Sequence, residues 1–262
     1  MMSKPIPQHK GRSLLGSTDF VESPPHFLLK LGQKYEEIVE FRFAHLRFVM
    51  VTSPELVREI LVSKAKFFRK AKRDVDIMSK FIGMGLVTSD GAHHQKQRKL
   101  AQPAFHVRRI AEYGDVMVDY TADMLDQWQV GEVRDISDEM FKLTMYIVTK
   151  TIFDVDKDAM VGQAERIGEA MHHLQAITNR DFNSVILWPE WIPTKSNRMR
   201  KQERQVLDDT IADLVATRRA TAGADGLIQD KGDLLSMLLL SQDEDNNFMT
   251  DTELRDELVT LF

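Results

Sequence analysis

His94 and Arg98 are the residues of this chain whose types and spacing most clearly suggest chemistry. Because they are four positions apart, an α-helix would place both side chains on one face. An arginine presents a planar pair of N–H donors that matches a carboxylate, and an imidazole adds a donor beside it. The pair therefore favours a carboxylate ligand. The alternative is a solvated basic helix face, since Lys96 and Lys99 flank the pair and such spacings are common on exposed helices.

Local signals predict the helix that would carry this pair. Thr88, Ser89 and Asp90 are all favourable N-cap residues, so the helix should begin at or just after them. Pro103 has no amide donor and disfavours the α conformation at Gln102, so the helix should stop or kink there.

The whole segment resembles helix C of the cytochrome P-450 monooxygenases. The shared pattern is Asp-Gly-x-x-His-x-x-x-Arg-Lys-Leu-x-x-Pro-Ala-Phe, which runs from Asp90 to Phe105. Members of that family usually carry Trp-x-x-x-Arg here, and those two residues hold a haem propionate. His94 stands at the Trp position and Arg98 at the Arg position. The resemblance therefore implies that His94 and Arg98 bind the haem cofactor.

The same resemblance suggests where a substrate would bind. The segment 64–84 corresponds to the variable loop between helices B and C, which covers the substrate side of the haem. Met84, Leu86 and Val87 would then line the distal pocket. Ordinary core packing of flexible methionine and aliphatic side chains is the alternative.

The order of predicted elements before this motif agrees with the resemblance. An amphipathic helix is expected from Pro24 to Tyr35, followed by alternating strands at 38–43 and 46–51 that form a hairpin. Ser53 and Pro54 then start another helix, as N-cap and first helical residue. Its buried face should carry Leu56, Val57, Ile60 and Leu61.

Later segments are mostly helical. We expect helices at 107–128, 133–153, 158–180, 196–221, 233–240 and 250–262, with the second of these largely buried and a linker at 222–226. The predicted fold class is mainly α with a small β-hairpin, the N-terminal part of the cytochrome P-450 fold from helix A to the start of helix I. The expected parts are 1–63 (helix A, hairpin, helix B), 64–105 (B–C loop, helix C), 106–221 (helices D to G) and 222–262 (helix H and the start of I).

Composition narrows the function classes. The 262 residues carry a formal net charge of -5, which argues weakly against nucleic-acid binding. No apolar run is long enough for a membrane span and no secretory signal is evident, so a cytoplasmic location is expected. His172 and His173 are adjacent, and adjacent side chains point about 100 degrees apart on a helix, which argues against a shared metal site.

The chain has no cysteine. Haem iron in the resembling family is held by a cysteine thiolate, so no metal ligand is predicted and the chain as given is expected to be inactive. The last predicted helix ends on apolar residues without a C-cap. We therefore expect a truncated domain that exposes apolar surface at 254–262.

The sequence supports two functional hypotheses. The first is a haem-dependent monooxygenase acting on a lipophilic organic substrate when complete. The resemblance implies that its electrons come from NAD(P)H through a ferredoxin, a flavodoxin or a reductase, which would dock on Lys96, Lys99, Arg108 and Arg109. The second hypothesis is a non-enzymatic all-α binding or regulatory protein, which leaves the ordered motifs unexplained.

Overall fold

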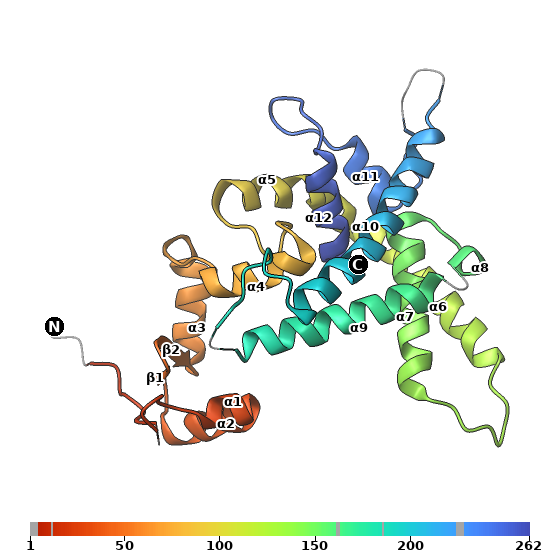
Figure 1. The fold of residues 1–262 in the computed structure, drawn as a ribbon. Coiled ribbons are helices and arrows are strands. Elements are labelled where there is room, and N and C mark those ends of the chain that lie inside the picture. Colours follow the sequence, from red (N-terminus) through yellow and green to blue (C-terminus); the bar gives the residue numbers. More distant parts are fainter. Residues whose placement is uncertain (1–4, 12, 161–162, 185, 224–227) are drawn as a thin grey trace. The chain divides into compact units, whose positions relative to one another are not determined.

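The computed structural model describes residues 5–11, 13–160, 163–184, 186–223 and 228–262. Its elements are mostly helices, together with one two-stranded antiparallel sheet (Figure 1). Contacts divide the chain into two compact units. Unit 1 comprises Met1–Arg69 and Asn183–Leu187, and unit 2 comprises Lys70–Phe182 and Trp188–Phe262.

Unit 1 is built around the predicted hairpin. Strands β1 (Ile38–Phe43) and β2 (Leu46–Val51) pair in the register Ile38 to Val51 through Phe43 to Leu46. Ala44 makes the tight turn with a positive φ of 52°, a conformation that usually favours glycine. Helix α1 (Asp19–Glu22) and helix α2 (Pro24–Lys34) precede the strands. The unit buries a small apolar cluster of Phe27, Leu31, Val39 and Phe41.

The helix after the hairpin begins where the sequence predicts. Ser53 caps α3 (Pro54–Arg58), since its Oγ accepts a hydrogen bond from the Leu56 amide at 3.4 Å. The chain continues as a π-helical turn, Glu59–Ser63, and a 3₁₀ turn, Ala65–Phe67. The buried face predicted for this helix was wrong, since Leu61 is 69% exposed and Leu56, Val57 and Ile60 are only half-buried.

Unit 2 begins with a helix that the sequence interpretation placed in a loop. Helix α4 (Lys72–Ile82) occupies most of the segment 64–84. Ile77 and Ile82 are buried, and Met78 and Phe81 pack against the same core. The family resemblance assigned this segment to a variable loop, although its apolar residues recur at helical spacing.

Helix α5 (Gly91–Ala101) is the helix predicted around His94 and Arg98. Asp90 is its N-cap, and the Asp90 Oδ1 accepts the Gly91 amide at 2.8 Å. At the other end, α5 stops at Ala101 as predicted, but Gln102 keeps right-handed helical angles, so the expected departure of Gln102 from the α conformation was wrong. The helix passes into a 3₁₀ turn, Gln102–Phe105, with Pro103 near its start, where a missing N–H donor is tolerated.

The middle of unit 2 consists of long helices. These are α6 (Val107–Asp126), α7 (Ile136–Phe153), α8 (Lys157–Met160), α9 (Gln163–Phe182) and α10 (Lys195–Ala220). Helix α7 was expected to be largely buried, but Met140 and Phe141 are 38% and 40% exposed, and burial is confined to its C-terminal half. The predicted helix 158–180 divides into α8 and α9, and 161–162 lie outside the described residues. Most of the predicted linker, 224–226, also lies outside them.

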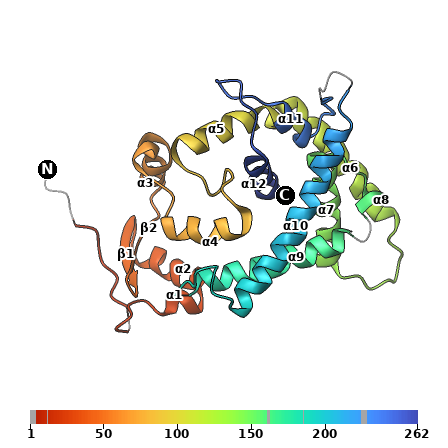
Figure 2. The same cartoon turned by 45° about the horizontal axis from the view of Figure 1, so that its top comes forward.

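Two C-terminal helices complete the core of unit 2. Helices α11 (Leu234–Leu240) and α12 (Asp251–Leu261) pack together, and α12 also contacts α4 and α10 (Figure 2). The expectation of exposed apolar surface at 254–262 was wrong, since Leu254, Leu258 and Val259 are at most 4% exposed. They belong to the largest apolar cluster of unit 2, where neighbouring helices cover the face that the sequence shows as unpartnered.

Candidate functional site

Helix α5 brings His94 and Arg98 to one face, as their spacing predicts. His94 is half-buried and Arg98 is exposed. Burial lowers the pKa of the His94 imidazole, and the cations Lys70 and Arg98 lower it further, whereas Asp90 opposes them. A neutral imidazole beside two cations leaves this surface with a net positive character and one ring N–H donor.

The cations around Arg98 are paired with carboxylates of the chain itself. Lys96 lies 3.3 Å from Glu253 and 3.4 Å from Asp243, and Lys99 lies 2.6 Å from Glu244. Across the described ranges, no salt bridge or side-chain hydrogen bond involves Arg98, although it acts electrostatically on His94. The guanidinium of Arg98 is thus the cation of this helix that is available for an external anion.

The other two residues of the expected docking surface are also engaged. Arg109 lies 2.7 Å from Asp230 and Arg108 lies 3.5 Å from Glu112. Arg108 remains 86% exposed at its side chain. Internal pairing reduces the net charge that this surface could present to an acidic protein.

Met84, Leu86 and Val87 lie on the turn between α4 and α5. Met84 and Val87 are 44% and 47% exposed, and Leu86 is half-buried against the main core cluster. Gly83 begins the turn with a φ of 73°. Two of the three apolar side chains are therefore accessible to a ligand, whereas Leu86 also contributes to packing.

Helix α12 supplies residues that the sequence interpretation missed. The Asp256 Oδ2 accepts the Met84 amide at 2.6 Å, and the Glu257 Oε2 accepts the Leu86 amide at 3.2 Å. Burial raises the pKa of Glu257 to about 7. No local sequence signal could have identified these contacts, because they join positions 172 and 171 residues apart.

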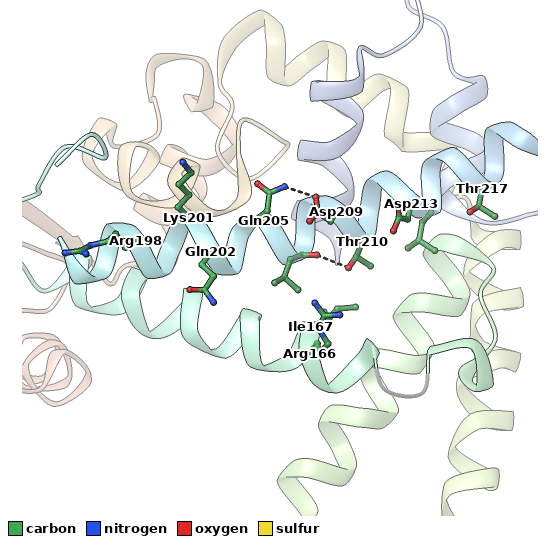
Figure 3. Close-up of a pocket in the computed structure, with 12 residues that line it drawn as sticks. Arg166, Ile167, Arg198, Lys201, Gln202, Gln205, Asp209, Thr210, Asp213 and Thr217 are labelled. Carbon is green, nitrogen blue, oxygen red and sulfur yellow. Dashed lines mark hydrogen bonds between the residues drawn. The ribbon is translucent and has the colours of Figure 1, made fainter. Parts of the chain in front are cut away.

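A separate surface groove of about 760 Å³ runs along α9 and α10. Figure 3 shows Arg198 and Lys201 toward one end of the groove and Asp213 and Thr217 toward the other. Gln205 donates to Asp209 at 2.7 Å across one turn of α10. Met84, Leu86 and Val87 do not line this groove, so it is distinct from the expected substrate position.

The paired histidines on α9 have separate environments. The His172 and His173 ring centroids are 6.4 Å apart, and the His173 Nδ1 lies 2.9 Å from the Glu203 Oε1. In the part of the chain that the structure describes, no group of three or more His, Cys, Asp or Glu residues could hold a metal ion. No helix among the described residues is long and apolar enough to cross a membrane.

The hydrogen-bond donors of α5 fit the propionate carboxylates of a haem, whereas the helix offers no thiolate ligand for the haem iron. Arg98 has a guanidinium without an acidic partner within the described ranges, and His94 adds a ring N–H on the same face. An axial thiolate has no counterpart in these 262 residues, which include no cysteine. The residues present therefore fit the propionate groups and leave the iron without a cysteine ligand from this chain.

Comparisons with known proteins give the family. The family model described as Cytochrome P450 matches residues 7–262. Cyclooctat-9-en-7-ol 5-monooxygenase of Streptomyces melanosporofaciens is 30% identical over 256 residues, covering 94% of this chain and 52% of the relative. Pentalenene oxygenase of Streptomyces avermitilis is 29% identical over 243 residues, covering 91% and 51% respectively.

Similarity extends to relatives of lower identity. Cytokinin hydroxylase of Arabidopsis thaliana is 26% identical over 232 residues, covering 85% of this chain and 43% of the relative. The chain thus spans about half the length of the curated relatives it matches. Together with the helical fold, the antiparallel hairpin and the His94–Arg98 helix, the match over nearly the whole sequence shows that this chain belongs to the cytochrome P450 family.

Proposed function

We propose that this chain forms the haem-propionate and substrate-facing part of a haem-dependent monooxygenase. The observation that carries the proposal is Arg98, whose guanidinium is exposed on α5 and has no carboxylate partner within the described residues. Similarity to a monooxygenase and an oxygenase supports the reaction class. When bound, the haem would supply dioxygen activation with an axial cysteine thiolate, which this sequence does not contain.

The residues of this chain would bind and orient rather than react. Arg98 would bind one propionate through paired N–H donors, and the neutral His94 would donate a further hydrogen bond. Met84, Leu86 and Val87 would form an apolar wall, which suits a lipophilic organic substrate. As given, the chain is expected to lack monooxygenase activity because it has no thiolate.

An electron donor of the ferredoxin, flavodoxin or reductase type, drawing on NAD(P)H, belongs to the same proposal. The exposed cations Lys99 and Arg108 are the candidates for its contact. An acidic electron donor would have to displace Glu244 and Glu112, the carboxylate partners of these two cations. A cytoplasmic location likewise stays a prediction from the sequence.

Porphyrin binding tests the role of Arg98 without an iron ligand. The Kd of protoporphyrin IX is measured by fluorescence for the purified protein and for Arg98→Ala. Loss of a charge-assisted bidentate contact should weaken binding about 10-fold to 100-fold. Protoporphyrin IX dimethyl ester, whose carboxylates are blocked, should bind both proteins equally.

Two further variants test whether the loss of porphyrin affinity is specific to Arg98. His94→Ala should weaken protoporphyrin binding less than Arg98→Ala, because one neutral hydrogen bond is lost instead of a charged pair. Lys72→Ala removes an exposed cation of unit 2 that pairs with Asp76, and it should leave the Kd unchanged. Equal affinity of wild type and Arg98→Ala for protoporphyrin IX would contradict the propionate role.

A further inference from the structure

Helix α12 holds the turn between α4 and α5 through two neighbouring carboxyl groups. The Asp256 Oδ2 accepts the Met84 amide at 2.6 Å, and the Glu257 Oε2 accepts the Leu86 amide at 3.2 Å. The two hydrogen bonds fix alternate residues of one short loop. Met84 and Leu86 are two of the three residues expected to face a substrate, so these bonds bear directly on the shape of that wall.

The turn is in close contact with the helix. A Cβ on Gly83 would lie 2.0 Å from the Asp256 Oδ1, and a Cβ on Gly85 would lie 2.6 Å from the Asp256 main-chain oxygen. Both distances are shorter than any real van der Waals contact. The two glycines flanking Met84 thus allow the loop backbone to approach α12 closely enough for both carboxyl groups to reach it.

The two carboxyl groups have different surroundings. Arg255 lies 2.9 Å from the Asp256 Oδ1 and 2.6 Å from the Asp208 Oδ1 on α10. Glu257 is 0% exposed, and its second oxygen, Oε1, has no hydrogen-bond partner among the described residues. Burying a carboxyl group with one unsatisfied oxygen costs free energy. Packing alone does not explain why a carboxyl group stands at this position, because an apolar side chain would fill the same space without this cost in free energy.

We propose that Asp256 and Glu257 are positioning residues, which set the conformation of residues 83–87 and thereby the shape of the substrate-facing wall. The substrate role of this wall rests on the proposed function, whereas the hydrogen bonds and close contacts do not. Neither carboxyl group is proposed to touch a substrate or a cofactor.

The burial of Glu257 and the charges around it make the hydrogen bond between Glu257 and the Leu86 amide depend on pH. Burial raises the pKa of Glu257 to about 7, and the nearby carboxylates Asp256 and Glu253 act in the same direction. The Leu86 amide and Lys70 oppose the shift. Beyond these groups, Arg255 pairs with Asp256, and His93 and Lys96 on α5 face Glu253.

The sign of the dependence follows from hydration of the carboxyl group. If the turn opens and Glu257 meets water, its pKa falls toward the ordinary value of 4.5. Opening then releases a proton, so it becomes more favourable as the pH rises from about 5 to about 7. The wild-type protein should hold the turn more firmly at pH 5 than at pH 8.

Amide hydrogen exchange of the purified protein tests the proposal. Asp256→Ala should lower the protection factor of the Met84 amide about tenfold, and Glu257→Leu should do the same for Leu86, because each removes one acceptor. Asp256→Asn and Glu257→Gln keep an acceptor oxygen and should restore most of the protection. Asp251→Ala is the matched control, since Asp251 lies on the same helix and pairs with Arg219 instead.

The pH profile provides a second, independent measurement. Wild-type protection at Leu86 should decline from pH 5 to pH 8, and Glu257→Gln should show a flat profile. Unchanged protection at Met84 and Leu86 in the two acceptor-deleting variants would overturn the proposal, as would an equal loss at amides throughout unit 2. If Glu257→Leu does not fold, unchanged Met84 protection in Asp256→Ala overturns the proposal, and a flat wild-type profile overturns the pH dependence. These measurements need no porphyrin. They therefore still test the roles of Asp256 and Glu257 if the proposed cofactor role of Arg98 fails.

Discussion

Glu257 shows how a single buried group can make stability depend on pH. Its folded pKa of about 7 lies above the ordinary value of 4.5, so the folded state keeps a proton that the unfolded state releases in that range. The stability contributed by protonation is therefore complete below about pH 4.5 and is lost as the pH rises through 7. We expect the unfolding free energy of wild type, relative to Glu257→Gln, to fall between pH 5 and pH 8. Urea unfolding at several pH values measures this difference, and a constant difference would contradict the buried, protonated state.

At the scale of elements, two glycines differ in how closely their backbone approaches a neighbouring helix. A Cβ at Gly85 would lie 2.3 Å from the Thr260 Oγ1 and 2.6 Å from a backbone oxygen of α12, whereas a Cβ at Gly114 in α6 would meet nothing within 4 Å. Gly85→Ala should destabilise by about 1–3 kcal/mol through overpacking. Gly114→Ala should stabilise by about 0.5–1 kcal/mol, because alanine loses less entropy in a helix. Chemical denaturation of both variants checks the pair, and similar effects would contradict the close contact.

The start of α12 offers a second test at this scale. Thr250 and Glu253 form a capping box, in which the Glu253 amide donates to the Thr250 Oγ1 at 3.2 Å and the Thr250 amide donates to Glu253 at 2.9 Å. Thr250→Ala should cost about 1 kcal/mol of stability. Thr252→Ala, two residues into the same helix, is the control and should be near neutral. Thermal unfolding distinguishes them, and equal losses would mean that the cap contributes nothing specific.

At the scale of the whole molecule, Arg218 joins three elements of unit 2. Its guanidinium lies 2.6 Å from Asp233 at the start of α11 and donates to the Phe153 carbonyl at the end of α7 at 2.8 Å. Arg218 and Asp233 are 5% and 3% exposed. Removing one partner leaves an uncompensated buried charge, so Asp233→Ala should cost about 3–5 kcal/mol.

An exposed pair in the same unit provides the comparison. Lys72 and Asp76 lie 2.9 Å apart on α4, with side chains 87% and 49% exposed. Asp76→Ala should change the unfolding free energy by less than about 1 kcal/mol. Denaturant titration of both variants gives the two values. A small effect of Asp233→Ala would show that water reaches Arg218 and that the junction is not closed.

Most helices and the hairpin could be predicted from the sequence because their determinants are local. The Ser53 cap with Pro54, the alternation along β1 and β2, and the His94–Arg98 spacing all act within a few residues. Helix α4 was missed because the family resemblance assigned its segment to a variable loop, and Leu61 is exposed although its helical spacing predicted burial.

The amino-acid sequence by itself therefore determined most of the elements, their order, the family motif on α5 and the absence of a cysteine ligand. Only the tertiary structure decided which cations are neutralised, leaving Arg98 without a carboxylate partner among the described residues while Lys96 and Lys99 are paired. It also decided that Asp256 and Glu257 reach a turn 172 and 171 residues earlier. The physical reason is the distance along the sequence over which each kind of interaction acts. Backbone hydrogen bonds and side-chain periodicity act over one or two turns, whereas these contacts depend on how the helices of unit 2 pack around α12.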